Sequence, residues 1–139
     1  MNFLLDTAVV SEWMKPAPNP GVIRWLAEVD EDRVFLSVIT LAELRFGTER
    51  LASGARKSRL DSWLREELPL RFDGRILNIE AVIADAWGRL VSRCSAAGRP
   101  IGVMDAFFAA TAEVQALTLV TRNVSDFTAS GIPLLNPWS

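Results

Sequence analysis

Five short apolar runs alternate with longer segments of helical character, and this alternation restricts the possible folds more than any other feature of the sequence. The runs are Phe3–Leu5, Val34–Ser37, Arg75–Ile79, Thr118–Thr121 and Leu134–Leu135. Parallel strands need a long crossover connection, usually a helix, so short strands separated by helices favour a mainly parallel sheet. Such a sheet is covered by helices on both faces. The sequence therefore predicts an α/β fold around a short, mainly parallel central sheet.

Apolar periodicity and helix-ending residues predict the positions of the helices. Asn19 and Pro20 are a cap and first-turn pair for a helix that runs through Val29. Gly54, Pro69 and Gly98 are expected to end helices that precede them. The further helices are predicted over Leu41–Ser53, Lys57–Leu68, Glu80–Ala97 and Met104–Ala116. The last of these is almost uniformly apolar, so we expect it to be buried on most sides.

Composition and chain length favour one domain over residues 1–139. Half of the residues are hydrophobic, which is enough for one sizeable core, and no repeat or long linker divides the chain. The N-terminus does not resemble a secretory leader, and no apolar run approaches the roughly 20 residues that span a bilayer. The single cysteine, Cys94, lies on the apolar face of a predicted helix and is expected to be a packed thiol. These features predict a cytoplasmic protein without a membrane segment.

The absence of histidine excludes several enzyme classes. It removes the usual base of Ser-His-Asp hydrolases, the histidine pair of metal-free ribonucleases and the ligands of most catalytic zinc sites. A Gly-rich phosphate loop and a G-x-S-x-G nucleophile elbow are also missing. An enzyme with this sequence would have to use carboxylates, hydroxyls and a bound cation.

Acidic and amide side chains follow the predicted strands. Asp6 comes directly after the first strand, and Glu43 lies in the first turn of the helix after the second. Asp105 is the only charged residue between Ile101 and Ala112, while Asn123 and Asp126 follow the fourth strand. In open parallel sheets, functional groups collect beyond the carboxyl ends of the strands. We therefore expect these side chains to lie at one edge of the sheet.

Most of these residues also have a purely structural interpretation. Asp6 could cap the helix that follows it, and Thr40-x-x-Glu43 matches a capping box. Asn123 and Asp126 could be turn or cap residues. Asp105 is harder to explain in this way, because burial of an unpaired carboxylate is costly and a shared cation would offset that cost. Oxygen ligands without His or Cys select Mg²⁺, or Mn²⁺, and favour a phosphodiesterase over an acyl-transfer enzyme.

At these residues the sequence resembles the PIN-domain proteins. Four segments look like the four motifs of the family in order and spacing, and the tail Leu135–Trp138 is similar to that of the VapC and FitB-like branch. The segments are Leu4–Thr7, Ser37–Leu44, Gly102–Ala110 and Val120–Asn123. The resemblance extends over essentially the whole chain. It implies a three-layer α/β/α fold, Mg²⁺-dependent RNA cleavage, a homodimer, and inhibition by a small DNA-binding antitoxin in a heterotetramer or larger complex.

The resemblance also implies roles for single residues. Asp6, Glu43 and Asp105 match the first three acidic positions, so they are the expected catalytic and metal-binding residues. The fourth position is often Asp in the family and is Asn123 here, which puts a second metal site in doubt, although Asp126 could compensate. Thr7 and Thr121 match hydroxyls that orient water or phosphate.

Two other functions are compatible with the sequence. One is a catalytically weak or inactive PIN fold that only binds RNA or a partner, because Asn123 replaces an acid. The other is a phospho-acceptor domain, which groups carboxylates around Mg²⁺ but normally has paired acids after the first strand and a late lysine. This chain has one acid there, and its only lysines are Lys15 and Lys57.

Contacts with RNA and with a partner would require local surfaces, because the net charge is −2. The candidate RNA-binding cations are Arg45, Arg56, Lys57, Arg59 and Arg122. A solvated helix face is the alternative explanation for the first four. The region Leu41–Leu68 has more apolar positions than one core-facing stripe requires, which predicts either a groove for an antitoxin segment or packing within the fold or a dimer. These positions are Leu44, Phe46, Leu51, Leu60, Trp63 and Leu64.

Overall fold

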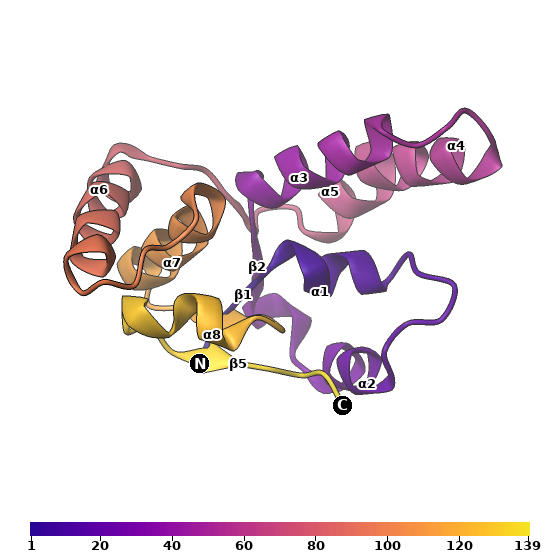
Figure 1. The fold of residues 1–139 in the computed structure, drawn as a ribbon. Coiled ribbons are helices and arrows are strands. Elements are labelled where there is room, and N and C mark those ends of the chain that lie inside the picture. The colour runs from indigo at the N-terminus through magenta and orange to yellow at the C-terminus, as the bar shows by residue number, and fades with distance from the viewer.

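A five-stranded sheet forms the centre of the computed structural model, which describes residues 1–139 (Figure 1). The strand order is β3-β2-β1-β4-β5, and every neighbouring pair is parallel. The strands are β1 (Phe3–Leu5), β2 (Val34–Ser37), β3 (Ile76–Leu77), β4 (Thr118–Val120) and β5 (Leu134–Leu135). The predicted α/β class is confirmed, and each predicted strand is present. The third and fourth strands are shorter than expected.

The order of the strands creates a switch point between β1 and β4. The chain begins in the central strand, adds β2 and β3 on one side, and then crosses to add β4 and β5 on the other. Backbone pairing continues one residue past the strands, since the Asp6 amide donates to the Val120 carbonyl at 2.9 Å. Likewise, the Thr121 amide donates to the Leu135 carbonyl at 2.9 Å. The first residues beyond β1 and β4 are therefore fixed side by side.

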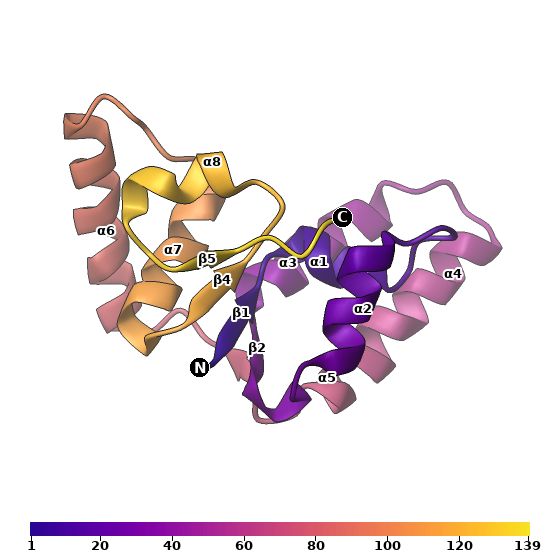
Figure 2. The same cartoon turned by 90° about the horizontal axis from the view of Figure 1, so that it is seen from below.

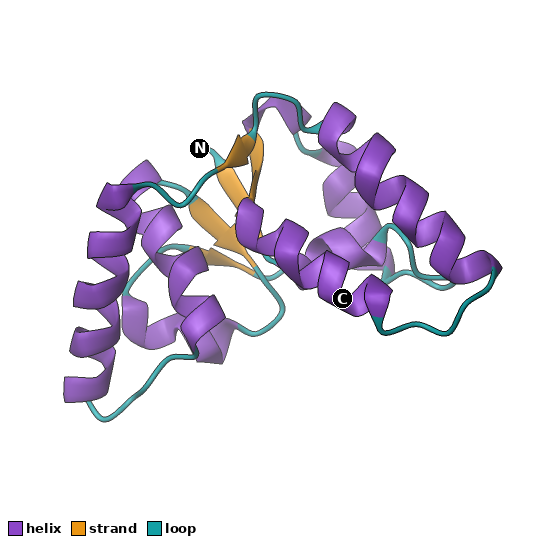
Figure 3. Ribbon diagram, turned by 90° about the horizontal axis from the view of Figure 1, so that it is seen from above, coloured by secondary structure: helices purple, strands orange, loops and turns teal.

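Alternating side chains of β1 build two cores, one on each face of the sheet. Leu5 belongs to the first core, with residues of α1 (Thr7–Glu12), α2 (Pro20–Glu28) and α5 (Leu68–Arg71). Leu4 points to the second core, with residues of α6 (Ala81–Ala96), α7 (Val103–Gln115) and α8 (Val124–Phe127). Figures 2 and 3 show these two groups of helices on opposite sides of the strands. The three-layer arrangement follows directly from the two-residue period of a strand.

Helix α3 (Val38–Glu49) begins three residues earlier than the sequence analysis predicted. The Ser37 hydroxyl accepts a hydrogen bond from the Ile39 amide at 3.0 Å, so Ser37 is the N-cap. Thr40 therefore lies inside the helix, and the capping-box interpretation of Thr40 and Glu43 is wrong. The helix also ends earlier than expected, with Arg50 as its C-cap.

Pro69 does not end a helix, contrary to the sequence-based prediction. Helix α4 (Ala55–Ser62) continues through the π-helix η2 (Trp63–Glu67) into α5. In the π segment the Leu68 amide bonds to the Trp63 carbonyl, five residues earlier. This change of register puts Pro69 in the first turn of a new α-helical segment, where a missing N–H is tolerated.

The predictions for the remaining helices are confirmed to within two residues. Asn19 caps α2 through hydrogen bonds from the Gly21 and Val22 amides, and Gly98 follows α6 with a positive φ of 72°. Helix α7 is buried over most of its middle, and Cys94 is fully buried in the second core. The 3₁₀ turns η1 (Glu31–Arg33) and η3 (Thr128–Ser130) complete the chain. No helix combines the length and apolar character that crossing a membrane requires.

Candidate active site

Asp6 lies at the switch point and is bound to the neighbouring strand. Its side chain is 8% exposed and accepts a hydrogen bond of 2.7 Å from the Thr121 hydroxyl. Thr121 is fully buried, and its hydroxyl oxygen accepts a hydrogen bond from the Asn123 amide. Although Asp6 occupies the N-cap position of α1, its carboxylate makes no capping hydrogen bond. The capping interpretation is therefore wrong, and the carboxylate is instead held toward β4.

Glu43 reaches the same edge of the sheet from α3. Its carboxylate accepts a 2.6 Å hydrogen bond from the Thr7 hydroxyl. The Thr7 and Thr40 hydroxyl oxygens are 3.1 Å apart. Because Thr7 gives its single proton to Glu43, Thr40 must be the donor to Thr7. Thr40 thus positions Glu43 indirectly, a role that the sequence analysis missed. The three-residue spacing from Glu43, one helical turn, was the available clue.

Asp105 has no stabilising partner. It lies in the first turn of α7, partly buried, and takes part in no ion pair or side-chain hydrogen bond. Burial and the nearby charges of Asp6, Asp126 and Glu43 raise its pKa to about 6. Burial, together with Glu43 and Asp126, also raises the pKa of Asp6, although the Thr121 hydrogen bond opposes the shift. The charges of Glu43 and Asp126 therefore lie close enough to hinder the ionisation of Asp6 and Asp105.

The donor set fits a hard divalent cation, because it consists only of carboxylate and hydroxyl oxygens and contains no neutralising Arg or Lys. In the present geometry no group of three acidic side chains is close enough together to bind one ion. No hydrogen bond restrains the Asp105 carboxylate, so it can adjust. Asp6 and Glu43 are the fixed members of the cluster.

Known proteins share both the sequence and the fold. The PIN-domain family model matches residues 3–128. Toxin FitB of Neisseria gonorrhoeae is 38% identical over 135 residues, which cover 97% of this chain and 97% of that protein. The VapC ribonuclease Y4jK of Sinorhizobium fredii is 33% identical over 97% of this chain and 96% of its own length. A FitAB structure bound to a DNA fragment matches with a TM-score of 0.93 and 35% identity, covering 99% of this chain and 96% of that chain.

The chain belongs to the PIN-domain family. Within it, the relatives assign the chain to the VapC/FitB toxins of type II toxin–antitoxin systems. The resemblance recognised from the four sequence motifs is thereby confirmed.

The negative charge near the fourth motif of this PIN domain comes from α8, which follows the motif. Asn123 occupies the N-cap position of α8, but its side chain makes no capping hydrogen bond. The backbone amide of Asn123 instead donates to the Thr121 hydroxyl and orients it. Asp126 is exposed on α8, and its charge contributes to the raised pKa of both Asp6 and Asp105. Asp126 therefore shares the electrostatic environment of the site, whereas Asn123 acts through its backbone.

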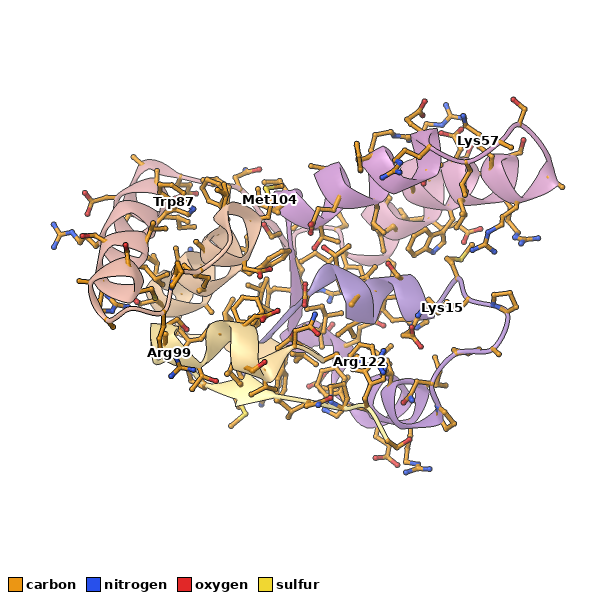
Figure 4. The ribbon with its side chains drawn as sticks, in the orientation of Figure 1. Lys15, Lys57, Trp87, Arg99, Met104 and Arg122 are labelled. Carbon is orange, nitrogen blue, oxygen red and sulfur yellow. The ribbon has the colours of Figure 1, made fainter.

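The expected RNA-binding cations differ in whether other residues of the chain already bind them. Arg45 forms ion pairs of 2.7 Å with Asp61 and 3.1 Å with Glu49, so it is held on α3 and α4 rather than free at the pocket. Arg56 lines a groove that also contains Glu43. Arg122 lies over the Trp138 ring, as Figure 4 helps to locate. The remaining two lie outside that groove: Lys57 donates to the Glu49 carbonyl, and Arg59 borders a separate cavity.

A buried acid that the sequence analysis missed is Glu12, which is 2% exposed. Burial acts to raise its pKa, but hydrogen bonds from Lys15 and the Asn19 amide, with the charges of Lys15 and Arg122, hold the pKa below its ordinary value. Its i,i+3 spacing to Lys15 was the clue in the sequence. Glu12 joins α1 to the start of α2 and is a structural acid.

The Thr121 hydroxyl can be tested by Thr121→Val, which keeps the shape of the side chain. We expect the free energy of unfolding at neutral pH to fall by about 1.5–3 kcal/mol, the value of a hydrogen bond to a charged group. The pKa of Asp6 should rise further, because the opposing hydrogen bond is lost. Thr111→Val is the control, since Thr111 is also fully buried but donates within its own helix to Phe107. NMR titration of the Asp6 carboxyl group measures the effect. An unchanged Asp6 pKa in Thr121→Val would contradict the proposed effect of the Thr121 hydroxyl on Asp6. Thr121→Ser keeps a hydroxyl and should restore the wild-type pKa.

Asp105→Asn should raise the melting temperature of the metal-free protein by a few degrees at neutral pH. Since the pKa is raised in the folded state, the folded protein binds the proton more tightly than the unfolded chain. Protonated Asp105 therefore stabilises the folded state below its ordinary pKa of 3.8. This contribution to the free energy of unfolding is lost as the pH rises to about 6. The gain in the variant should disappear in acid. Asp73→Asn, at an exposed turn, is the control. A melting temperature that falls in metal-free Asp105→Asn at neutral pH would refute the repulsion.

Proposed function

We propose that this PIN domain is an Mg²⁺-dependent endoribonuclease, with Mn²⁺ as the alternative ion, that hydrolyses RNA phosphodiester bonds as a toxin in the bacterial cytoplasm. The observation that carries the proposal is the group of carboxylates without a neutralising cation at the switch point, above all Asp105, which has no hydrogen-bond or ion-pair partner. Strongly perturbed acids without a cation are typical of functional sites. The family and its ribonuclease members support the reaction class.

A bound divalent cation would supply counter-charge for the phosphate and acidify a water molecule for attack on phosphorus. Asp6 and Asp105 are the residues that would hold it, directly or through water, and Glu43 would assist. Asp6 is preset by the hydrogen bond from Thr121, while the Thr40–Thr7 pair fixes one oxygen of Glu43. The second oxygen of Glu43 is free to accept a hydrogen bond from a water molecule and so to orient it. Thr7 and Thr121 thus position carboxylates.

A catalytically weak PIN module that binds RNA or a partner is the second candidate. Two observations favour it: the fourth motif ends in Asn123, and no three acids meet at one point. Both candidates predict RNA contact, so only cleavage separates them.

Cleavage of RNA by the purified toxin should require Mg²⁺ or Mn²⁺ and should fall at least about a hundredfold in Asp6→Asn, comparable to the loss of one electrostatic catalytic group. Asp73→Asn makes the same chemical change far from the site and should leave the rate unchanged. Single-turnover cleavage of labelled RNA, with circular dichroism to verify folding, is the measurement. Metal-independent cleavage, or equal rates in the two variants, would exclude the mechanism. A folded wild-type protein that binds RNA without cutting it would support the second candidate.

An apolar groove of about 260 Å³ is the proposed docking site for the antitoxin. Four of the six apolar positions singled out in the sequence line it, whereas Leu64 is buried in the first core and Phe46 is 64% exposed outside it. The four are Leu44, Leu51, Leu60 and Trp63. Thr7 and Glu43 lie in the same groove. A cation on a helix docked there would reach Glu43 and compete for the charge that holds the metal.

Leu60→Ala should weaken antitoxin capture, because it removes apolar surface from the groove and Leu60 is only partly buried in the free toxin. The expected loss of affinity is roughly tenfold or more, from about 2 kcal/mol of buried side chain. Phe46→Ala is the control from the same region. Co-expression followed by titration calorimetry gives the two affinities. If Phe46→Ala weakens binding and folded Leu60→Ala does not, the antitoxin binds elsewhere.

We further infer a homodimer and, with the antitoxin, a heterotetramer or larger assembly. Exposed apolar side chains lie on α6 and α7, at Val82, Val103 and Met104, of which Figure 4 labels Met104. Trp87 braces this surface, since its indole donates to the Val103 carbonyl at 3.0 Å and its ring stacks on Phe107. Contact with a second copy would remove this surface from water.

A further inference from the structure

A cavity of about 390 Å³ lies beside Asp105 and Asp126, away from the antitoxin groove. One wall is the segment Arg99–Gly102 between α6 and α7, and the other comes from α8 and η3 through Ser125, Asp126 and Ala129. Only two of its eight lining residues are hydrophobic. The volume is at the lower end of the range of about 300–1,000 Å³ for small-molecule sites. The space suits one polar ligand of nucleotide size next to the acidic cluster.

Arg99 is the only cation that lines this cavity. The two other arginines near this end of the molecule are neutralised, Arg89 by Asp85 and Arg93 by Glu113. Arg99 forms no ion pair and is exposed to solvent at the cavity wall, where Figure 4 shows it beside α8. Its positive charge is therefore available to a ligand.

The backbone of Arg99 is held in place. Its amide donates to the Cys94 carbonyl at 2.9 Å, and the Gly98 amide donates to Ser95 at 3.0 Å. This pair of bonds is a Schellman motif, made possible by the positive φ of Gly98. Pro100 follows and restricts the chain further. The motif anchors Arg99 to the carbonyl of the fully buried Cys94 in the last turn of α6, so the Arg99 side chain starts from a fixed point.

The charges of the cavity are separated. Asp105 and Asp126 come from α7 and α8, whereas Arg99 comes from the connection between α6 and α7 and forms no ion pair with either acid. A ligand that fits both sides must carry one anionic group toward the acids and their cation, and a second toward Arg99. Consecutive phosphates of a single RNA strand meet this requirement, whereas a free monophosphate satisfies only one side.

We propose that this cavity is a nucleotide subsite, in which Arg99 binds the phosphate next to the scissile one and Ser125 faces the intervening nucleoside. The subsite rests on the proposed ribonuclease function and specifies how its substrate is held. Arg99 is a substrate-binding residue in this assignment, and it belongs to none of the four family motifs quoted from the sequence. A phosphate contact of this kind positions the strand and leaves base preference unchanged.

The test compares Arg99→Gln with Arg24→Gln, which removes the same charge from an exposed, unpaired position on α2. Cleavage of a labelled single-stranded RNA should show KM raised about tenfold in Arg99→Gln, with kcat changed little and the cut site retained. Binding of the same RNA, with Ca²⁺ replacing Mg²⁺ to limit cleavage, is followed by fluorescence anisotropy over a salt series. The log–log slope should decrease in magnitude by about 0.7 in Arg99→Gln, the loss of one phosphate contact. Arg99→Lys keeps the charge and should recover part of both effects.

A second substrate locates the contact. In an RNA with a neutral methylphosphonate beside the mapped cut site, wild-type protein should lose about as much affinity as Arg99→Gln loses on normal RNA. The neutral linkage should then have no added effect on Arg99→Gln. If wild-type protein cleaves RNA but Arg99→Gln equals Arg24→Gln in KM and salt slope, the subsite is wrong and the ribonuclease function stands. If folded wild-type protein neither binds nor cleaves RNA, both proposals fail.

Discussion

The hydrogen bond between Thr121 and Asp6 joins the two strands on which the site depends. Thr121 follows β4 and Asp6 follows β1, so the bond closes the switch point of the sheet at 2.7 Å. Its position depends on the register of the strands, because the Asp6 amide must pair with Val120 at the same time. A shift by one residue would exchange Leu4 and Leu5 between the two cores and also move Asp6 away from Thr121. Core packing and site geometry are thus specified by the same pairing.

The two kinds of buried acid in this PIN domain reveal how it separates stability from function. Glu12 is almost fully buried, but Lys15 and the Asn19 amide satisfy it, and its pKa lies below the ordinary value. Asp105 is less buried, yet desolvation and the nearby charges of Asp6, Asp126 and Glu43 raise its pKa to about 6. The chain could have placed a cation beside Asp105 as it does beside Glu12. The missing partner reduces the stability of the metal-free fold and leaves charge available for an ion and its substrate.

The sequence predicted the strands and the acidic edge because both depend on local patterns. Phe3–Leu5 and Val34–Ser37 were predicted to the residue, since short apolar runs between helices have few alternatives. Pro69 misled the prediction, because the π turn that accommodates it depends on Trp63 and Leu64 packing in the core. Thr40 was misassigned for a similar reason. Its hydroxyl binds Thr7, which is far away in sequence, and no local pattern contains that contact.

Ion pairs between helices that are distant in the sequence could also not be predicted from the sequence. Arg45 lies two residues from Glu43, which suggested a cation at the pocket, but Asp61 on α4 binds it at 2.7 Å. No sequence pattern indicated a role for Arg99, because it lies in a short connection outside the recognised motifs. Its availability becomes apparent only when the ion pairs of Arg89 and Arg93 are known.

The fourth acidic position of this PIN domain illustrates how a site can keep its charge while a motif loses an acid. Asn123 stands where the family often has Asp, and its amide supports Thr121 regardless of the side chain. The backbone contribution of this position to Asp6 is therefore retained. Asp126, three residues later and in the first turn of α8, supplies a negative charge that both Asp6 and Asp105 sense. Because Asp126 is exposed and also lines the Arg99 cavity, its charge lies nearer to the substrate side than that of Asp6. The site consequently has a firmly held acid at the sheet and a solvent-exposed one on α8, so the two acids differ in how strongly the fold restrains them.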